Sequence, residues 1–370
     1  MSNQTERRKA NHIRISMNRD VQARGRTTCF EHVHLIHNAL PEIDMRTVDM
    51  STDFLNHNFA APVFMGALTG GTKEAMKINA TIAEAVEKMA LGMGVGSQRA
   101  ALEDRSLEET FAVVRRKAPT AFIAANVGGA QLVGGYNLME VERAIEMIDA
   151  DAIVVHLNAL QEAVQPEGQT SFEGLVAKIK EISQNVEKPV IVKETGAGIA
   201  AEEARRLEEA GVQAIDVSGS GGTSWAAVEY YRARNLKKTL QSRLGHAFWD
   251  WGIPTAVSVV EVTETVNIPV IASGGIRSGI DAAKALALGA SLTSLSQPVL
   301  QVASKSVKDT EEFLTLIIEE LRTVMFVVGA RSIQDLQKVP LVLTGRMAEW
   351  LRVRGFEIDK FAQRGRNIEC

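Results

Sequence analysis

Short apolar runs alternate along the chain with longer segments whose apolar residues recur at helical spacing. The runs that we expect to form strands cover 61–67, 93–97, 121–127, 152–158, 189–195, 214–219, 269–274 and 291–296. Amphipathic segments such as 73–90 and 201–211 lie between most of these runs. Because the strand runs are continuously apolar rather than alternating, both faces of each strand are predicted to be buried, as in a parallel sheet covered by helices.

Eight such strands favour a closed (β/α)₈ barrel of the TIM type over an open doubly wound sheet. The predicted organisation is one domain, because no Pro/Gly/Ser-rich linker interrupts the chain. Within it we expect an N-terminal arm over 1–60, the barrel over 61–297 and a C-terminal helical extension over 298–370. The Trp-rich segment 220–268, between the sixth and seventh strands, is predicted to be an insertion with helices of its own above the barrel mouth.

Composition narrows the possible partners and location. Among 370 residues, 41 are basic and 45 acidic, which gives a formal charge of −4 and no general attraction to nucleic acid or an anionic membrane. Cys29 and Cys370 are too few and too far apart for a disulfide framework. No leader pattern or membrane-length apolar run is apparent. We therefore expect a cytoplasmic protein.

Polar residues end the fourth predicted strand in the stretch AIVVHLNALQE, residues 152–162. His156, Asn158, Gln161 and Glu162 follow four apolar residues within seven positions. In a (β/α)₈ barrel the C-terminal ends of the strands form the active-site face, so these side chains are predicted to enter the barrel mouth. Most other strands also end in polar or glycine-rich residues, which favours a functional site there.

Two glycine-rich loops indicate a phosphate site. Gly274, Gly275 and Arg277 follow the seventh strand and precede a helical run, so backbone N–H groups can approach an anion there. Thr223 in the loop SGSGGT, residues 218–223, can add a hydroxyl. The structural alternative is a pair of tight glycine turns. Together the loops predict a ligand with one phosphate, such as a mononucleotide flavin.

Lys193 interrupts the apolar run PVIVKE. A lysine that points into a barrel needs a partner, since an unpaired buried ammonium is costly. In the structural alternative, the partner of Lys193 is Glu194 or Asp216. In the functional alternative, the lysine contacts the electron-rich edge of a flavin and stabilises its reduced anionic form.

Glu162 with its amide neighbours favours Mg²⁺, which accepts a single carboxylate and completes its shell with water and substrate phosphates. Zinc is disfavoured because it prefers several His or Cys ligands. His156 is either a pocket residue or a satisfied core histidine.

Two basic groups predict a second phosphorylated ligand. Arg8 and Lys9, with His12 further along, form one group, and Arg99 after Ser97 and Gln98 forms the other. Such side chains clamp phosphates with charge-assisted hydrogen bonds. The alternative for the first group is a solvated, frayed terminus.

These motifs resemble those of the type 2 isopentenyl-diphosphate Δ-isomerases, which are FMN-dependent barrel enzymes of archaea and some bacteria. The matching stretches are RRKANH near the N-terminus, LTGG (68–71), MGVGSQR (93–99), HLNALQE (156–162), KETGAGI (193–199), DVSGSGGTSW (216–225), DWGIPT (250–255) and SGGIRSG (273–279). They span nearly the whole chain. The combination of HLNALQE with GVGSQR is specific, whereas single glycine motifs occur in other FMN barrels.

The resemblance implies a set of residues for each ligand. For FMN the implied residues are Ala67, Leu68, Thr69, Ser97, Asn126, Lys193, Ser218, Thr223, Gly275, Ile276, Arg277, Ser296 and Gln297. For the substrate diphosphate they are Arg8, Lys9, Ser97, Gln98, Arg99 and Gln161, with His156 and Asn158 lining the pocket and Mg²⁺ on Glu162. The pair Ala67 and Leu68 and the polar stretch SLSQP (294–298) depart from the family's usual residues at the flavin edge.

The implied activity is the reversible isomerisation of isopentenyl diphosphate to dimethylallyl diphosphate. Reduced FMN, formed with NADPH or NADH, would act as acid and base, supported by His156, Asn158, Gln161 and Lys193. A homo-oligomer, a tetramer or an octamer, is also implied. One alternative is an FMN-dependent 2-hydroxy-acid dehydrogenase or oxidase, which needs a His closely followed by an Arg near strands six and seven, whereas His246 is followed by AFWDWG. Another is a non-catalytic phosphate-binding sensor.

Overall fold

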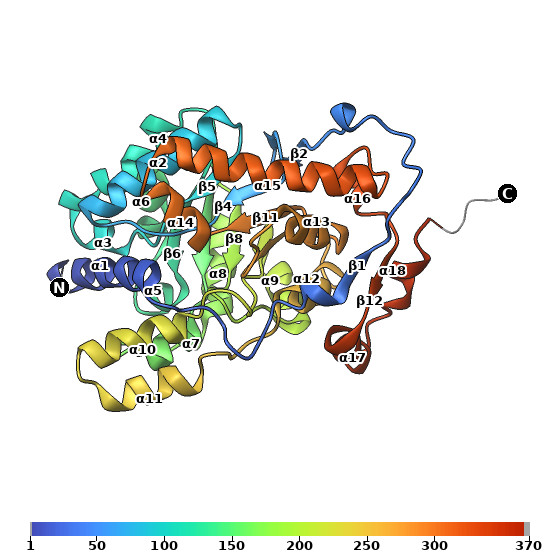
Figure 1. Cartoon of the computed structure of the whole chain (residues 1–370). Coiled ribbons are helices and arrows are strands. Elements are labelled where there is room, and N and C mark those ends of the chain that lie inside the picture. Colours follow the sequence, from blue (N-terminus) through green and yellow to red (C-terminus); the bar gives the residue numbers. More distant parts are fainter. Residues whose placement is uncertain (1, 366–370) are drawn as a thin grey trace.

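Eight parallel strands close into a barrel in the computed structural model, which describes residues 2–365 and their side chains from Arg7 onward (Figure 1). Around the barrel they are β4 (Val63–Met65), β5 (Gly92–Gly94), β6 (Phe122–Gly128), β7 (Ala152–His156), β8 (Val190–Lys193), β9 (Ala214–Asp216), β10 (Val270–Ser273) and β11 (Leu292–Leu295). The parallel pairing of β11 with β4 closes the ring. The predicted (β/α)₈ barrel is confirmed, and every strand overlaps its predicted run.

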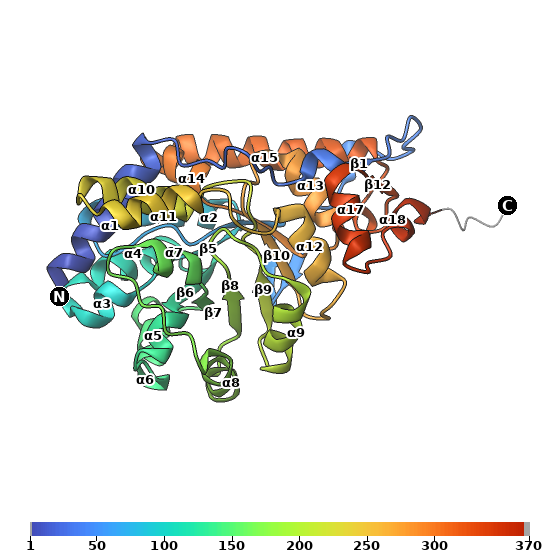
Figure 2. The same ribbon diagram turned by 90° about the horizontal axis from the view of Figure 1, so that it is seen from below.

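The helices that follow the strands lie outside the barrel, as Figure 2 shows for α6, α8 and α9. They are α2 (Lys73–Lys88), α3 (Arg99–Glu103), α4 (Glu109–Lys117), α5 (Gly129–Val133), α6 (Leu138–Ile148), α7 (Ala159–Val164), α8 (Leu175–Asn185), α9 (Ala201–Glu209), α12 (Thr255–Thr263), α13 (Gly279–Ala287) and α14 (Gln297–Ala303). The predicted helices over 73–90 and 201–211 are therefore present with slightly earlier ends. Helix α9 stops before Gly211, whose φ of 86° is left-handed and suits glycine after a helix.

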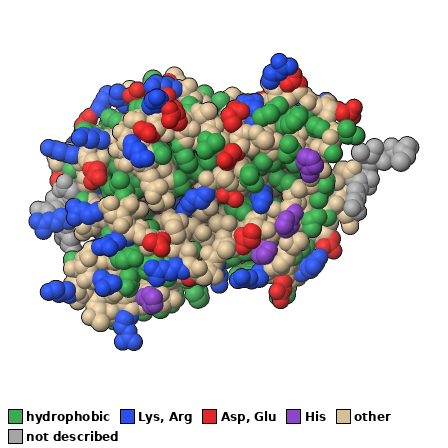
Figure 3. Space-filling view, viewed as in Figure 1, with side chains coloured by type: hydrophobic (Ala, Val, Ile, Leu, Met, Phe, Trp, Pro, Cys, Tyr) green, Lys and Arg blue, Asp and Glu red, His purple; other side chains and the backbone are tan. Residues whose placement is uncertain are grey.

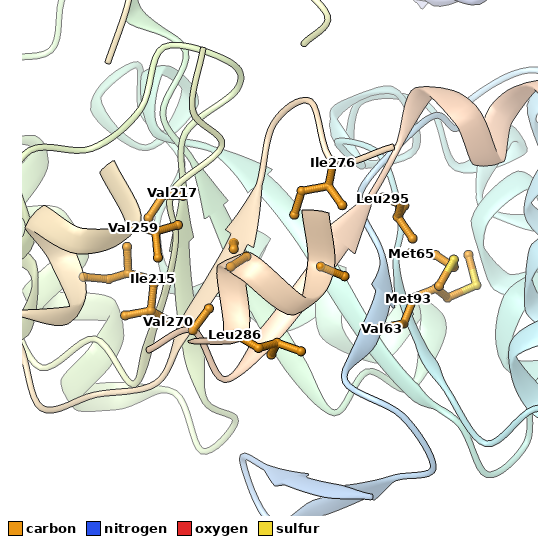
Figure 4. Close-up of a cluster of buried hydrophobic side chains, with 14 of the residues drawn as sticks. Val63, Met65, Met93, Ile215, Val217, Val259, Val270, Ile276, Leu286 and Leu295 are labelled. Atoms are coloured by element: carbon orange, nitrogen blue, oxygen red, sulfur yellow. The ribbon is translucent and has the colours of Figure 1, made fainter. Parts of the chain in front are cut away.

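Strand residues alternate between two hydrophobic cores. Val63, Met65 and Ile215 point outward and pack against the surrounding helices (Figure 4). Phe64 and Phe122 belong to a separate inner core. The hairpin of β2 (Thr52–Phe54) and β3 (His57–Phe59) adds Phe54 and Phe59 to this inner core. Aromatic rings therefore fill the inside of the barrel below its polar mouth.

The segments before and after the barrel meet each other. Strand β1 (Val33–Leu35) pairs antiparallel with β12 (Leu341–Leu343), so the C-terminal extension is not wholly helical. The extension also contains α15 (Val307–Val327), α16 (Ile333–Leu336), α17 (Gly345–Val353) and α18 (Asp359–Gln363). The division of the chain at residues 60 and 297 stays a prediction, and Cys370 lies outside the described residues.

The N-terminal arm begins with α1 (Ser2–Asn18), which contacts α10 (Trp225–Asn235) and α14 beside the barrel (Figure 1). Helices α10 and α11 (Thr239–Ala247) form the insertion that was predicted between the sixth and seventh strands. Among the described residues, no helix combines the length and apolarity needed to cross a membrane. Acidic and basic side chains are mixed on the face shown in Figure 3, which agrees with the small net charge.

Candidate active site

A polar layer caps the inner core at the C-terminal ends of the strands. The inward residues of β7 and β8, Val154 and Ile191, belong to the inner core. Because side chains alternate along a strand, the next inward positions are His156 and Lys193. Both line the cavity above the core. The alternation of side-chain direction along β7 and β8 thus places His156 and Lys193 at the barrel mouth.

Two adjoining clefts occupy this mouth. The first cleft has a volume of about 960 Å³ including its open side. Of the residues predicted to bind the cofactor, those that line it are Ala67, Leu68, Thr69, Lys193, Ser218, Thr223, Gly275, Arg277, Ser296 and Gln297. Ser97 and Asn126 line the second cleft instead. The side chain of Ile276 packs in the outer core (Figure 4), so only its backbone is available to a ligand.

The glycine-rich loops after β9 and β10 pack backbone against backbone. Gly274 and Gly275 have left-handed φ values of 96° and 76°. A Cβ atom on Gly222 would lie 2.4 Å from the backbone nitrogen of Gly275, so a larger residue would separate the loops. The hydroxyl of Thr255 donates to the carbonyl of Gly274 at 2.5 Å. Gly274 and Gly275 line the first cleft, so backbone rather than side chain faces a ligand there, which fits the single phosphate predicted for a mononucleotide flavin.

Lys193 lies on the wall that the two clefts share. Its Nζ donates to the backbone carbonyl of Glu194 at 2.5 Å, and no ion pair to a described carboxylate is present. The Glu194 carboxylate accepts from the backbone N–H groups of Gly196 and Ala197. Burial raises the pKa of Asp216, although the nearby Lys193 opposes the shift. The ammonium of Lys193 therefore remains available to a ligand in either cleft.

The second cleft is rich in cations. Arg8 and Lys9 enter it from α1, and Arg99 enters from α3. Lys9 Nζ donates to the carbonyl of Ser97 at 2.8 Å. Burial, together with the charges of Arg8 and Arg99, lowers the pKa of Lys9 to about 7. An anionic ligand would relieve this repulsion, so the cleft is suited to a diphosphate.

Glu162 also lines the second cleft and is 5% exposed. Its carboxylate accepts hydrogen bonds from Asn158 Nδ2 at 3.0 Å, from Gln165 Nε2, and from the backbone N–H of Gln169 at 2.7 Å. A carboxylate has about four lone-pair sites, so one is left for a cation. Asn158 Oδ1 is buried without a hydrogen-bond partner among the described residues. A water of a hydrated Mg²⁺ would satisfy it, so these donors fit that ion.

Two predicted substrate residues differ in position. Gln161 lines the second cleft, whereas Gln98 lines neither cleft and is fully buried. The Nε2 of Gln98 donates to the carbonyl of Ala144 in α6 at 2.8 Å. Its Oε1 accepts from the backbone N–H of Asn126 at 2.8 Å. The side chain of Gln98 is thus occupied inside the protein, and we leave it out of the proposed diphosphate site.

A buried ionic network beside the clefts was not predicted. His12 Nε2 lies 2.8 Å from Glu229 Oε1, and Arg232 bridges Glu229 to Glu167 at 2.7 and 2.6 Å. Burial alone would raise the pKa of Glu229, but the bonds from His12 and the charge of Arg232 lower it. The network joins α1, α10 and the loop that follows Glu162. Trp225, also missed, lines both clefts and lies within the quoted stretch DVSGSGGTSW.

Comparison with known proteins identifies the family. An isopentenyl-diphosphate delta-isomerase of Methanothermobacter thermautotrophicus is 48% identical over 357 residues, which are 96% of this chain and 99% of that protein. The chain belongs to the isopentenyl-diphosphate delta-isomerase family. The Pyrococcus furiosus member of this family is 47% identical, covering 96% of this chain and 91% of its own. The resemblance inferred from the motifs is therefore confirmed.

The wider relationship of this isomerase family is to FMN enzymes. The family model for FMN-dependent dehydrogenases matches residues 156–342. A solved mandelate oxidase is 21% identical, with a TM-score of 0.61 over 92% of this chain and 98% of its own. Another, bound to a monooxide FMN adduct, is also 21% identical, with a TM-score of 0.61 over 86% and 90%. At this identity the likeness establishes the shared barrel fold alone.

His246 separates this isomerase-family chain from the 2-hydroxy-acid alternative. That chemistry needs a histidine closely followed by an arginine near the sixth and seventh strands, yet His246 in that segment lies on α11 and lines neither cleft. Its ring packs against Tyr230 and Trp249, with centroid distances of 5.8 and 6.4 Å.

Proposed function

We propose that the protein interconverts isopentenyl diphosphate and dimethylallyl diphosphate, with FMN in the first cleft and the diphosphate in the second. The observation that carries the proposal is the adjacency of two clefts with different chemistry. One is bordered by the backbone of Gly274 and Gly275, and the other contains Arg8, Lys9 and Arg99. Membership of the isomerase family and the match to FMN-dependent dehydrogenases support the assignment.

Each group of residues has a defined task in this proposal. Lys193, which lines both clefts, would contact the cofactor and would stabilise the negative charge of its reduced form. Arg8, Lys9 and Arg99 would hold the diphosphate, and Glu162 would hold a Mg²⁺ that neutralises part of its charge. When bound, FMN reduced by NADPH or NADH would supply the acid and base of the proton transfers, with no net oxidation.

In this reaction, the protein's role would be to hold the substrate in a fixed position. The 1,3-shift adds a proton at one carbon and removes one from another, so the alkene must stay at a fixed place. A diphosphate anchored by Arg8 and Lys9 from α1 fixes the polar end of the substrate. The hydrocarbon end then extends toward the shared wall, where Leu68 and Trp225 are apolar or aromatic.

The test is an anaerobic assay with FMN, NADPH, Mg²⁺ and isopentenyl diphosphate, in which dimethylallyl diphosphate is followed by NMR. Arg8→Ala is expected to raise the KM by roughly 10–100-fold, because a charge-assisted hydrogen bond contributes about 1.5–3 kcal/mol. Arg7→Ala is the matched control, since Arg7 is exposed and lines neither cleft. Absence of product with the flavin-loaded protein would refute the proposal.

A cytoplasmic location and assembly into a homo-oligomer, a tetramer or an octamer, are also proposed from the family resemblance. Light scattering of the purified protein tests the assembly.

A further inference from the structure

The imidazole of His156 hydrogen-bonds the side chain of Asn126, and a hydrogen bond with the backbone of Val127 also acts on it. Its Nδ1 lies 2.7 Å from Asn126 Oδ1, and the ring lines the second cleft. The two ring nitrogens of a neutral histidine differ, because one carries the proton and the other a lone pair. Which nitrogen is the donor is set by the partner of the other.

The orientation of the Asn126 amide decides this question. Asn126 Nδ2 donates to the carbonyl oxygen of Val95 at 3.1 Å. A flipped amide would place Oδ1 against that carbonyl and Nδ2 against His156, which would lose the first bond. Oδ1 is therefore the atom that faces His156. Since this oxygen only accepts hydrogen bonds, Nδ1 of His156 must carry the proton.

Gln98 supports Asn126 from behind. The backbone N–H of Asn126 donates to Gln98 Oε1 at 2.8 Å, and the backbone N–H of Gln98 donates to the carbonyl of Asn126 at 2.9 Å. Gln98 Nε2 is fixed in turn by the carbonyl of Ala144 in α6. In this series of hydrogen bonds, each group can act either only as a donor or only as an acceptor. Gln98 thus holds the backbone of Asn126 in place, and the side-chain amide of Asn126 reaches the imidazole.

We propose that Asn126, supported by Gln98, is a positioning residue that holds neutral His156 with its proton on Nδ1 and leaves Nε2 as a hydrogen-bond acceptor toward the second cleft. An unprotonated Nε2 attracts an N–H or O–H group and repels a phosphate oxygen. His156 thus differs in role from Arg8 and Lys9, which attract the anion. It recognises a donor on the ligand or on a water bound with it.

Electrostatics around the ring agree with a neutral imidazole. Although part of the ring faces the cleft, burial lowers the pKa of His156 to about 3, and the positive charges of Lys193 and Lys9 act in the same direction. Lys193 approaches from the neighbouring strand β8, where it is the register partner of His156. Lys9 approaches from α1. A proton on both ring nitrogens would add a third cation to this group.

The test is the tautomer of His156 in the FMN-loaded protein, measured by long-range ¹H–¹⁵N NMR with ¹⁵N-labelled histidine near neutral pH. His156→Gln identifies the signal among the seven histidines. The expected result is a protonated Nδ1 and an unprotonated Nε2. Asn126→Ala should move the proton to Nε2, whereas Asn126→Asp keeps an acceptor and should retain it on Nδ1.

A matched control separates this effect from general destabilisation. Asn79 is also a buried asparagine with two backbone hydrogen bonds, but it lies on α2 and bonds to Thr69 and Thr110. Asn79→Ala should leave the His156 tautomer unchanged. A wild-type protein with its proton on Nε2 would overturn the proposal, and this measurement stands even if Asn126→Ala fails to fold.

The expected effect of Asn126→Ala on turnover rests on the proposed isomerase function, whereas the assignment of the His156 tautomer does not. Asn126→Ala is expected to lower kcat by roughly 10–100-fold, by analogy with removal of the hydrogen-bonded partner of a metal-ligating histidine. Because Asn126 is also among the residues implied for FMN, the tautomer is compared at saturating FMN, and an Asn126→Ala protein that keeps the proton on Nδ1 would overturn the positioning role. If the wild-type protein shows the expected tautomer but no isomerase activity, the proposed function fails and the assignment of His156 survives.

Discussion

Replacement of Glu162 by Gln tests the metal site at almost constant side-chain volume. The change removes the negative charge that three donors now surround: Asn158 Nδ2, Gln165 Nε2 and the backbone N–H of Gln169. We expect the Mg²⁺ dependence to disappear. Activity should fall at least roughly 100-fold, equivalent to about 2.7 kcal/mol, because the bridging cation stabilises charge on the diphosphate.

The cost to folding follows from the same three hydrogen bonds. A bond to a charged acceptor contributes about 1.5–3 kcal/mol and a bond between neutral groups about 0.5–1.5, so each bond loses about 1 kcal/mol on neutralisation. The new NH₂ group would also face a donor. Asn158 can resolve that conflict, because its Oδ1 has no partner among the described residues and rotation of the amide presents it to the NH₂. Glu162→Gln should therefore fold, with a free energy of unfolding about 3 kcal/mol lower.

Two measurements check this reasoning. Isomerase activity is titrated with Mg²⁺ for the wild type and the variant, and urea unfolding gives the difference in stability. Glu173→Gln serves as the control, since Glu173 is exposed and lines neither of the two clefts. An identical Mg²⁺ response in wild type and Glu162→Gln would show that Glu162 does not bind the metal. A variant that loses the fold would show that the Asn158 amide cannot rotate as proposed.

Three further predictions concern the cofactor and the anion site. The purified protein should bind FMN rather than FAD, which reversed-phase chromatography of the released flavin distinguishes; bound FAD would contradict the predicted single phosphate site. Lys193→Ala should weaken FMN binding by roughly 10–100-fold in a fluorescence titration, the loss of one charged hydrogen bond, while Lys180→Ala on the outer helix α8 should not. Because burial beside Arg8 and Arg99 lowers the pKa of Lys9 to about 7, diphosphate binding should take up a proton above pH 7 and weaken as the pH rises further. Calorimetry in two buffers with different ionisation heats measures this uptake, which Lys9→Met should abolish.

The barrel was predictable because its signals are local. Continuous apolar runs followed by amphipathic helices define each β/α unit, and eight units suffice to close a barrel. The pairing of β1 with β12 was not predictable in the same way. Each of these strands has three residues, and more than 300 residues separate the partners His34 and Val342. A run that short has no periodicity, and the pairing depends on tertiary packing.

The sequence predicted those cleft residues whose side-chain direction follows from their position along a strand. His156 and Lys193 follow inward apolar residues by two positions, so their side chains enter the mouth, and Glu162 reaches the same cleft from α7. Gln98 shows the limit of this reasoning. It lies between Ser97 and Arg99, which line the second cleft, and the sequence does not reveal that its amide turns toward α6.

The network of His12, Glu229, Arg232 and Glu167 explains why α1 is part of the site rather than a frayed end. Helix α1 places Arg8 and Lys9 in a cleft that also contains Arg99, so these cations repel one another. This repulsion contributes to the lowered pKa of Lys9. The carboxylates of Glu167 and Glu162 oppose the repulsion at Arg8. The buried carboxylate of Glu229 on α10 binds His12, one turn further along α1. Arg232 then connects Glu229 to Glu167, in the loop that follows Glu162. The His12–Glu229–Arg232–Glu167 network therefore links α1, which carries Arg8 and Lys9, to the loop that follows Glu162, although these segments are far apart in the sequence.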